Sequence, residues 1–188
     1  MNILRWILPL LCWSVFTQAQ AAEVAGVKLE DSVLVEGTPL ALNGAGVRSR
    51  MFIKVYVAAL YLPQKSNQAS AVTQVTGPRR MVLRMMRGLD AQTLTDALEE
   101  GVRNNSTATE LAQAKSALDE LVAQMRKIGK LNEADLVVIN LTSQLTRVSV
   151  NGRAAAQVTG ASLPGALLRI WLGENPVEGS LKSALLGG

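Results

Sequence analysis

The pattern of apolar positions divides the chain into strand-like flanks around a helical middle. Short apolar runs, separated by glycine and proline turns, extend from Val24 to about Arg87 and return between Leu136 and Val158. Between residues 90 and 128, apolar residues instead recur at three- and four-residue spacing, which is the period of an amphipathic helix. Because strands and helices are grouped rather than strictly alternating, the pattern predicts an α+β fold with a mainly antiparallel sheet.

The predicted strands are 27–29, 33–35, 40–42, 52–62, 80–86, 136–141, 145–150 and 153–158. Asn151-Gly152 separates the last two strands, and Asn-Gly between strand-like runs is the strongest short hairpin signal. Gly44-x-Gly46 has no strand before it and no helix after it, so it predicts a tight turn or bulge rather than a dinucleotide-binding loop.

Four helices are predicted from their start signals. They begin after Asp90, near Ser106 or Thr107, at Ser162 and at Ser180. In the first helix Leu94, Leu98 and Val102 recur at four-residue spacing and form one apolar face. The third helix ends at Gly173, and its Trp171 is predicted to pack this helix against the sheet.

The amino terminus has the pattern of a secretory signal peptide. Arg5 gives it a positive start, an apolar run follows, and Ala19-Gln20-Ala21 is a small-x-small cleavage site. We therefore predict a signal peptide at 1–21 and a single mature domain at 22–188, which in a bacterium would be periplasmic. The apolar run is too short to span a bilayer stably, and the single cysteine, Cys12, would leave with it.

Composition excludes several kinds of chemistry. Removing residues 1–21 takes away only Arg5, so the net charge of +4 becomes +3. The remaining cations are scattered and aromatics are few, which argues against a nucleic-acid partner. With no histidine and no mature cysteine, we expect no metal site, no cofactor and neither a Ser-His nor a Cys-His nucleophile. Arg84 and Arg87 are predicted to be exposed partners of acidic helix faces.

The segment from Asn43 to Pro63 carries the main candidate chemistry. It places Arg48, Arg50, Tyr56 and Tyr61 in or beside an apolar strand rich in β-branched and aromatic residues. An arginine that enters an apolar layer must find an anionic or hydrogen-bonding partner. Arg48 and Tyr56 are therefore the best candidates for a ligand site.

This segment resembles the chalcone isomerase superfamily, and most closely its bacterial chalcone isomerase-like branch. The hallmark of that branch is Gly-x-Gly-x-Arg followed by Lys-Val-Tyr-x-Ala-x-Leu-Tyr, which matches Gly44, Gly46, Arg48 and residues 54–61 here. The resemblance implies an open-faced sandwich, in which helices cover one face of the sheet. It also implies a ligand cleft between the sheet and the helices.

In the fatty-acid-binding members of that family an arginine and a tyrosine hold the carboxylate, so the resemblance assigns these roles to Arg48 and Tyr56. Strand alternation sends Arg48 and Arg50 to the same face, which leaves open which of them points into the cleft. Tyr61 is a candidate for core or cleft wall. Ser162 is similar in position to a late hydroxyl residue of the family.

The isomerases of the family need further polar groups, and the matching positions of this sequence hold other residues. Tyr56 stands in the place of a strand threonine, Leu94 in that of a helix tyrosine, and about Gly101 in that of an asparagine. A shifted helix alignment would put Asn104 or Asn105 there instead. We therefore expect no catalytic residues and a small-molecule ligand, namely a fatty acid or similar amphipathic carboxylate.

Two alternatives stay open at this point. One is a partner-docking protein whose cleft is vestigial and filled by its own side chains. The other is an isomerase of the intramolecular lyase type with an unknown substrate. A continuous apolar cavity that ends at Arg48 and Tyr56 would favour the ligand-binding hypothesis over the docking one.

Overall fold

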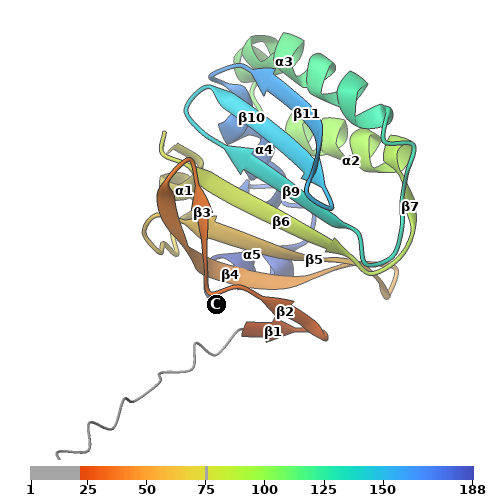
Figure 1. The fold of residues 1–188 in the computed structure, drawn as a ribbon. Helices are drawn as coiled ribbons and strands as arrows, with labels where there is room; N and C mark the ends of the chain where they lie inside the picture. The colour runs from red at the N-terminus through yellow and green to blue at the C-terminus, as the bar shows by residue number, and fades with distance from the viewer. Residues whose placement is uncertain (1–21, 75) are drawn as a thin grey trace, which may run out of the picture.

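A computed structural model describes residues 22–74 and 76–188; the predicted signal peptide lies outside these residues. Seven antiparallel strands form one sheet in the order β11-β10-β9-β6-β5-β4-β3 (Figure 1). They are β3 (Ser32–Val35), β4 (Thr38–Arg50), β5 (Ile53–Leu62), β6 (Arg79–Met85), β9 (Leu136–Leu141), β10 (Leu145–Val150) and β11 (Arg153–Thr159). Two small pairs accompany the sheet, β1 (Ala22–Val24) with β2 (Val27–Leu29) and β7 (Leu89–Asp90) with β8 (Lys130–Leu131).

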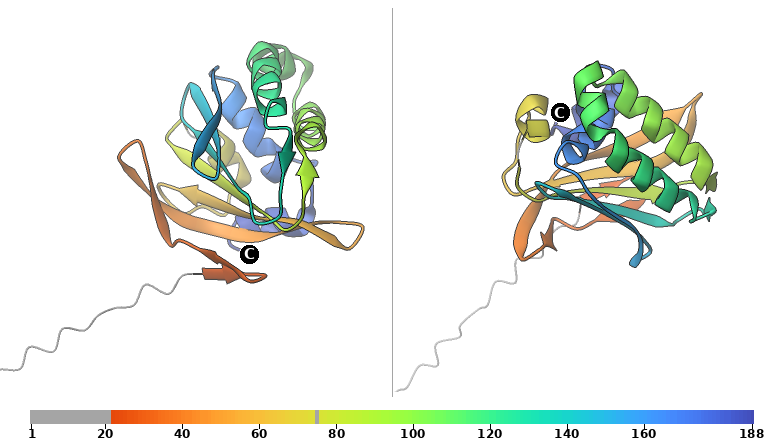
Figure 2. Two further views of the ribbon diagram at one scale, coloured as in Figure 1. Left: turned by 45° about the vertical axis from the view of Figure 1, so that its right-hand side comes forward. Right: turned by 90° about the horizontal axis from the view of Figure 1, so that it is seen from above.

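The helices gather on one face of this sheet, and the β1–β2 hairpin lies on the other (Figure 2). They are α1 (Ala69–Gln74), α2 (Ala91–Asn104), α3 (Ala108–Arg126), α4 (Leu163–Leu172) and α5 (Gly179–Leu185). The larger apolar core lies between the helices and the sheet. The prediction of an α+β open-faced sandwich is confirmed.

Local signals explain several element boundaries. Thr107 caps α3 through a reciprocal capping box, in which its hydroxyl accepts from the Glu110 amide and the Glu110 carboxylate accepts from the Thr107 amide. Asp90 precedes α2 as predicted, although its side chain makes no capping hydrogen bond. Asn151 and Gly152 have φ of 50° and 78°, so the predicted two-residue hairpin turn is confirmed.

Two predicted segments differ from the structure, and the short strands β1, β7 and β8 were not predicted. Residues 69–74 form the short helix α1, not strand-like chain, and it buries Val72 in the core. Residues 40–42 are part of the long strand β4, which continues through Gly44 and Gly46 to Arg50. The two glycines therefore lie inside a strand. Of the predicted tight turn or bulge, the structure has the bulge, beside Gly44.

A bulge and two glycines let α5 pack closely on β4. Asn43 has no partner on β5, since Leu42 pairs with Tyr61 and Gly44 with Leu60. The freed Asn43 side chain donates to the Leu185 carbonyl at 2.7 Å. A Cβ at Gly44 would lie 2.1 Å from the carbonyl oxygen of Ala184. Only glycine therefore fits beneath α5 at this position.

Candidate functional site

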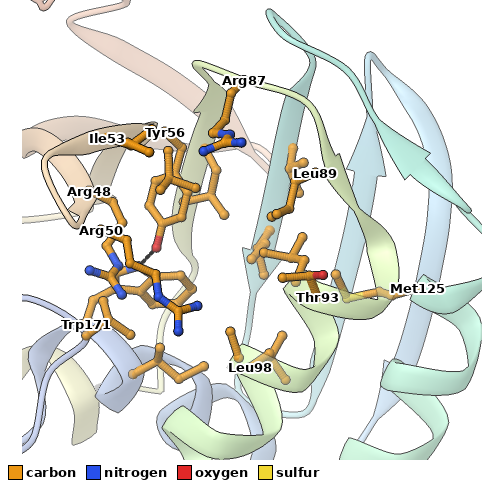
Figure 3. Close-up of a pocket in the computed structure, with 18 of the residues that line it drawn as sticks. Arg48, Arg50, Ile53, Tyr56, Arg87, Leu89, Thr93, Leu98, Met125 and Trp171 are labelled. Carbon is orange, nitrogen blue, oxygen red and sulfur yellow. Dashed lines mark hydrogen bonds between the residues drawn. The ribbon is translucent and has the colours of Figure 1, made fainter.

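A cavity of about 350 Å³ opens between the sheet and the helical layer (Figure 3). Its walls come from β5, β6 and β9 on one side and from α2, α3 and α4 on the other, and they are mostly apolar. Representative wall residues are Leu83, Leu98, Met125, Val137, Ile139 and Ile170. Arg48, Arg50 and Arg87 also line the cavity. It therefore combines an apolar interior with a group of cations.

Tyr56 presents a polar group within this cavity. It lies directly opposite Arg48 on the neighbouring strand, so the two side chains share a face of the sheet. The Tyr56 hydroxyl oxygen accepts a hydrogen bond from Trp171 Nε1 at 3.0 Å (Figure 3). Among residues 22–74 and 76–188 the hydroxyl proton has no acceptor. It is therefore available to an oxygen of a bound ligand.

Burial keeps this hydroxyl protonated. Removal from water raises the pKa of Tyr56 above its ordinary value of 10.0, and the Trp171 hydrogen bond and the nearby charge of Arg48 offset only part of that rise. Tyr56 therefore acts as a neutral hydrogen-bond donor near neutral pH. It is unsuited to serve there as a phenolate base.

Arg48 has both a structural contact and free donors. Its Nη1 donates to the Ser49 carbonyl at 2.7 Å and lies 3.5 Å from Glu178 Oε2. That same carboxylate oxygen accepts the Ser49 amide at 2.7 Å. Arg48 also lies near the Tyr56 hydroxyl, where burial raises the pKa and the charge and side-chain contact of Arg48 lower it in part. The hydrogen bonds with good geometry to described residues use Nη1 and leave Nε and Nη2 without one. One edge of the guanidinium is therefore tied to the protein and the other can bind a ligand.

A second bulge, on β5, brings Ile53 to the cavity that Arg50 reaches by strand alternation. Val55 has no partner on β4, because Tyr56 pairs with Arg48 and Lys54 with Ser49. Bulges re-aim side chains next to functional sites, and here both Arg50 and its partner Ile53 line the cavity. The sequence left open whether Arg48 or Arg50 points inward; in the structure both line the cavity.

The family model described as chalcone isomerase-like matches residues 21–187. This chain belongs to the chalcone isomerase-like family. A crystal structure of a fatty-acid binding protein from Arabidopsis thaliana aligns with a TM-score of 0.64 and 16% sequence identity, covering 86% of this chain and 92% of that chain. At this identity the likeness shows a shared fold. The comparison with curated protein sequences gave no significant match.

Within the described part of this chalcone isomerase-like protein, no helix has the length and apolar character needed to cross a bilayer. The same residues contain no group of three or more His, Cys, Asp or Glu that could hold a metal ion. The polar side chains that line the cavity are those of Arg48, Arg50, Tyr56, Arg87, Thr93 and Trp171.

Two of the sequence candidates lie elsewhere. Tyr61 packs with Leu40 and Leu29 on the opposite face of the sheet, because positions 56 and 61 differ by an odd number along a regularly paired stretch. Ser162 lines a separate, polar cavity of about 220 Å³ together with the buried Arg79. The structure therefore places neither residue at the cavity that holds Arg48 and Tyr56.

Sequence reasoning missed other lining residues. Trp171 packs α4 on the sheet as predicted, but it also orients the Tyr56 hydroxyl. Arg87 lines the cavity and forms no ion pair with any described carboxylate, contrary to its expected pairing with an acidic helix face. Thr93 adds a hydroxyl from α2. No local signal distinguishes these residues, because their neighbours come from distant parts of the chain.

The cavity wall on α2 lacks the polar groups expected of an isomerase. Leu94 lines the cavity where the family resemblance would place a tyrosine. A Cβ at Gly101 would lie 2.9 Å from Ile170, so this position serves close packing of α2 on α4. The Asn105 amide bonds to the carbonyl oxygens of Gly101 and Asn175. Neither Asn104 nor Asn105 lines the cavity.

Alkaline titration provides a test of the burial of both tyrosines. Burial raises the pKa of Tyr61 to about 12 and also raises that of Tyr56, and these are the two tyrosines of the chain. Stabilisation from the neutral phenols is complete below pH 10 and is lost as pH rises towards 12. We expect phenolate absorbance to appear well above pH 10 and together with unfolding. A smooth titration near pH 10 in the folded protein would contradict this.

Proposed function

We propose that this protein is a secreted, periplasmic and non-catalytic carrier that binds a fatty acid or a similar amphipathic carboxylate. The observation that carries the proposal is the apolar cavity beside Arg48 and Tyr56. A long-chain acid needs apolar walls for its tail and charged donors for its carboxylate. The cavity supplies both. Its secretion rests on the predicted signal peptide at 1–21.

The electrostatics favour an anionic head group. Arg48, Arg50 and Arg87 line the cavity, whereas Glu178 alone forms an ion pair with one of them among the described residues. A ligand carboxylate can bind the free edge of Arg48 and accept the Tyr56 hydroxyl proton. Charge-assisted hydrogen bonds of this kind are about twice as strong as neutral ones.

The size of the cavity supports a ligand-binding protein over a partner-docking protein whose cleft is vestigial. Small-molecule pockets usually range from about 300 to 1,000 Å³, and the volume here, about 350 Å³, lies within that range. A vestigial cleft would be filled by Leu94, Leu98 and their neighbours. These side chains line the space instead of closing it.

An isomerase activity receives less support from the site. Efficient turnover requires several polar groups that position a substrate and its developing charge. Beside Tyr56 and the arginines, the wall on α2 offers Thr93 and otherwise apolar side chains such as Leu94 and Leu98. The same features suit an aliphatic chain.

Native mass spectrometry with lipid extraction tests the proposal. The full chain is produced with its amino terminus, and the secreted protein is compared with Ala97→Phe, which places a ring at the cavity wall. Ala112→Phe on the exposed surface of α3 is the matched control. We expect wild type and the control to begin at Ala22 and carry a carboxylic acid, and Ala97→Phe to be largely empty.

Two results would contradict the proposal. Wild-type protein that is empty and takes up no added fatty acid would refute the proposed binding of a fatty acid. Protein that retains residues 1–21 and stays in the cytoplasm would refute secretion, while leaving the binding result to be judged separately.

A further inference from the structure

The hairpin between β4 and β5 ends in an exposed apolar tip formed by Met51, Phe52 and Ile53. Met51 is 82% exposed, Phe52 is fully exposed and Ile53 is 52% exposed. The hairpin projects beyond the helical layer (Figure 2). Isolated apolar side chains are common on surfaces, whereas three in sequence at a projecting tip indicate an interaction site.

The backbone of this tip is unfavourable for the residues it carries. Met51 and Phe52 have φ of 49° and 65°, a left-handed conformation that asparagine and glycine adopt readily and bulky residues do not. The β10–β11 turn of the same sheet uses Asn151 and Gly152 at equivalent angles. At 51 and 52 the side chains also gain little burial within the chain. Local folding energetics therefore do not explain an apolar pair here.

Cations surround the apolar tip. Arg50 precedes it, Lys54 follows it and Arg87 lines the adjoining cavity (Figure 3). All three are exposed, and none forms an ion pair with a carboxylate in residues 22–74 or 76–188. Apolar residues flanked by unpaired cations are the composition by which peripheral proteins bind anionic lipid surfaces.

We propose that this tip, residues 50–54, docks the protein reversibly on an anionic lipid bilayer. Met51 and Phe52 enter the headgroup region while Arg50, Lys54 and Arg87 contact lipid phosphates. A protein partner fits less well, because a stable interface buries about 800 Å² on each side. A large aromatic side chain buries about 150–250 Å², so three side chains at one tip fall short of that area.

The tip is continuous with the cavity, since Arg50, Met51 and Ile53 also line it. Docking would therefore place the cavity mouth at the lipid surface. An amphipathic acid could then move between bilayer and cavity without crossing bulk water. This exchange step rests on the proposed ligand, whereas the docking itself does not.

Vesicle co-sedimentation of the 22–188 chain tests the docking. The probes are vesicles of phosphatidylglycerol mixed with phosphatidylcholine, and vesicles of phosphatidylcholine alone. Phe52→Ser is expected to weaken binding to the mixed vesicles about tenfold or more, because burial of the ring is lost. Leu34→Ser is the matched control; Leu34 is another large apolar side chain, 68% exposed, on edge strand β3, and this variant should bind as wild type does.

Charge variants test whether the cations beside the tip contact lipid phosphates. Arg50→Gln with Lys54→Gln should weaken binding to the mixed vesicles, and added salt should weaken the binding of wild type. Arg153→Gln, which removes an exposed cation at the β10–β11 turn, is the charge-matched control and should have little effect.

Failure of wild type to sediment with the mixed vesicles would overturn the docking proposal. Equal losses in Phe52→Ser and Leu34→Ser would also overturn it. If wild type instead self-associates through Phe52, the tip belongs to a contact between two copies. Uptake of free fatty acid by Phe52→Ser in detergent-free buffer is measured in parallel. Retained uptake with lost docking separates this inference from the proposed function.

Discussion

Replacing Arg48 by alanine is expected to weaken fatty-acid binding about ten- to a hundredfold, because a hydrogen bond to a charged group contributes about 1.5–3 kcal/mol. The variant removes the free guanidinium edge opposite Tyr56. Trp171 provides the measurement: Trp6 and Trp13 fall within the predicted signal peptide, so Trp171 is the single tryptophan of residues 22–188. Its indole lies in the cavity, and its fluorescence should respond to added ligand.

Glu178→Gln distinguishes a ligand role of Arg48 from a purely structural one. Glu178 pairs with Arg48 and accepts the Ser49 amide, and a glutamine oxygen can still accept that amide. If Arg48 binds the ligand carboxylate, removing the competing charge should leave affinity unchanged or tighten it. If Arg48 serves only to hold Glu178, both variants should lower stability and neither should affect affinity specifically. The second pattern would contradict the proposed site.

Replacing Gly44 by alanine is expected to destabilise the fold by about 3 kcal/mol or more, the upper range for overpacking a core. The added Cβ would lie 2.1 Å from the Ala184 carbonyl oxygen and 2.7 Å from that of Leu185. Both obstacles are backbone atoms, so no side-chain rotation relieves the clash, and α5 must shift away from β4. Urea denaturation followed by circular dichroism measures the loss.

Gly179→Ala is the matched control for this prediction. Gly179 begins α5, nothing lies within 4 Å of a Cβ built there, and its φ is not in the left-handed region. The control should be neutral or slightly stabilising, because alanine favours helix over glycine. Equal midpoints for the two variants would show that α5 does not pack on β4 as described.

The contacts of α5 also show how the family motif works in this protein. Gly44 and Gly46 face Ala184 and Leu181 of α5, while Arg48, further along the same strand, reaches the residue that precedes the helix, Glu178. The glycines therefore position the carboxyl-terminal helix, and the arginine links its start to the cavity. The motif therefore combines the packing of α5 with a residue that lines the cavity.

Much of the fold could be predicted from local patterns. The helical period predicted α2 and α3, and Asn151-Gly152 predicted the last hairpin. These signals act over a few residues, so they can be read from the sequence directly. The helix α1 was missed because it is a single short stretch between strands, with only Val72 buried.

The residues that line the cavity were predicted in part, for a physical reason. Arg48, Arg50 and Tyr56 were identified because charged and polar groups in an apolar strand need partners. Alternation puts Tyr56 and Tyr61 on opposite faces of β5, but β5 is apolar on both sides, so the sequence did not show which face borders the cavity. Trp171 could not be found either, because its hydrogen bond to Tyr56 joins residues 115 positions apart.

By itself, then, the sequence determined most of the longer elements, the grouping of strands and helices, and the arginine and tyrosine candidates. These follow from short-range periodicity and from the cost of burying polar groups. The tertiary structure alone decided which face of the sheet the helices cover and where the cavity opens. It also decided that Glu178 pairs with Arg48 and that Arg87 lines the same cavity. Those features depend on packing between distant segments, and local patterns do not encode it.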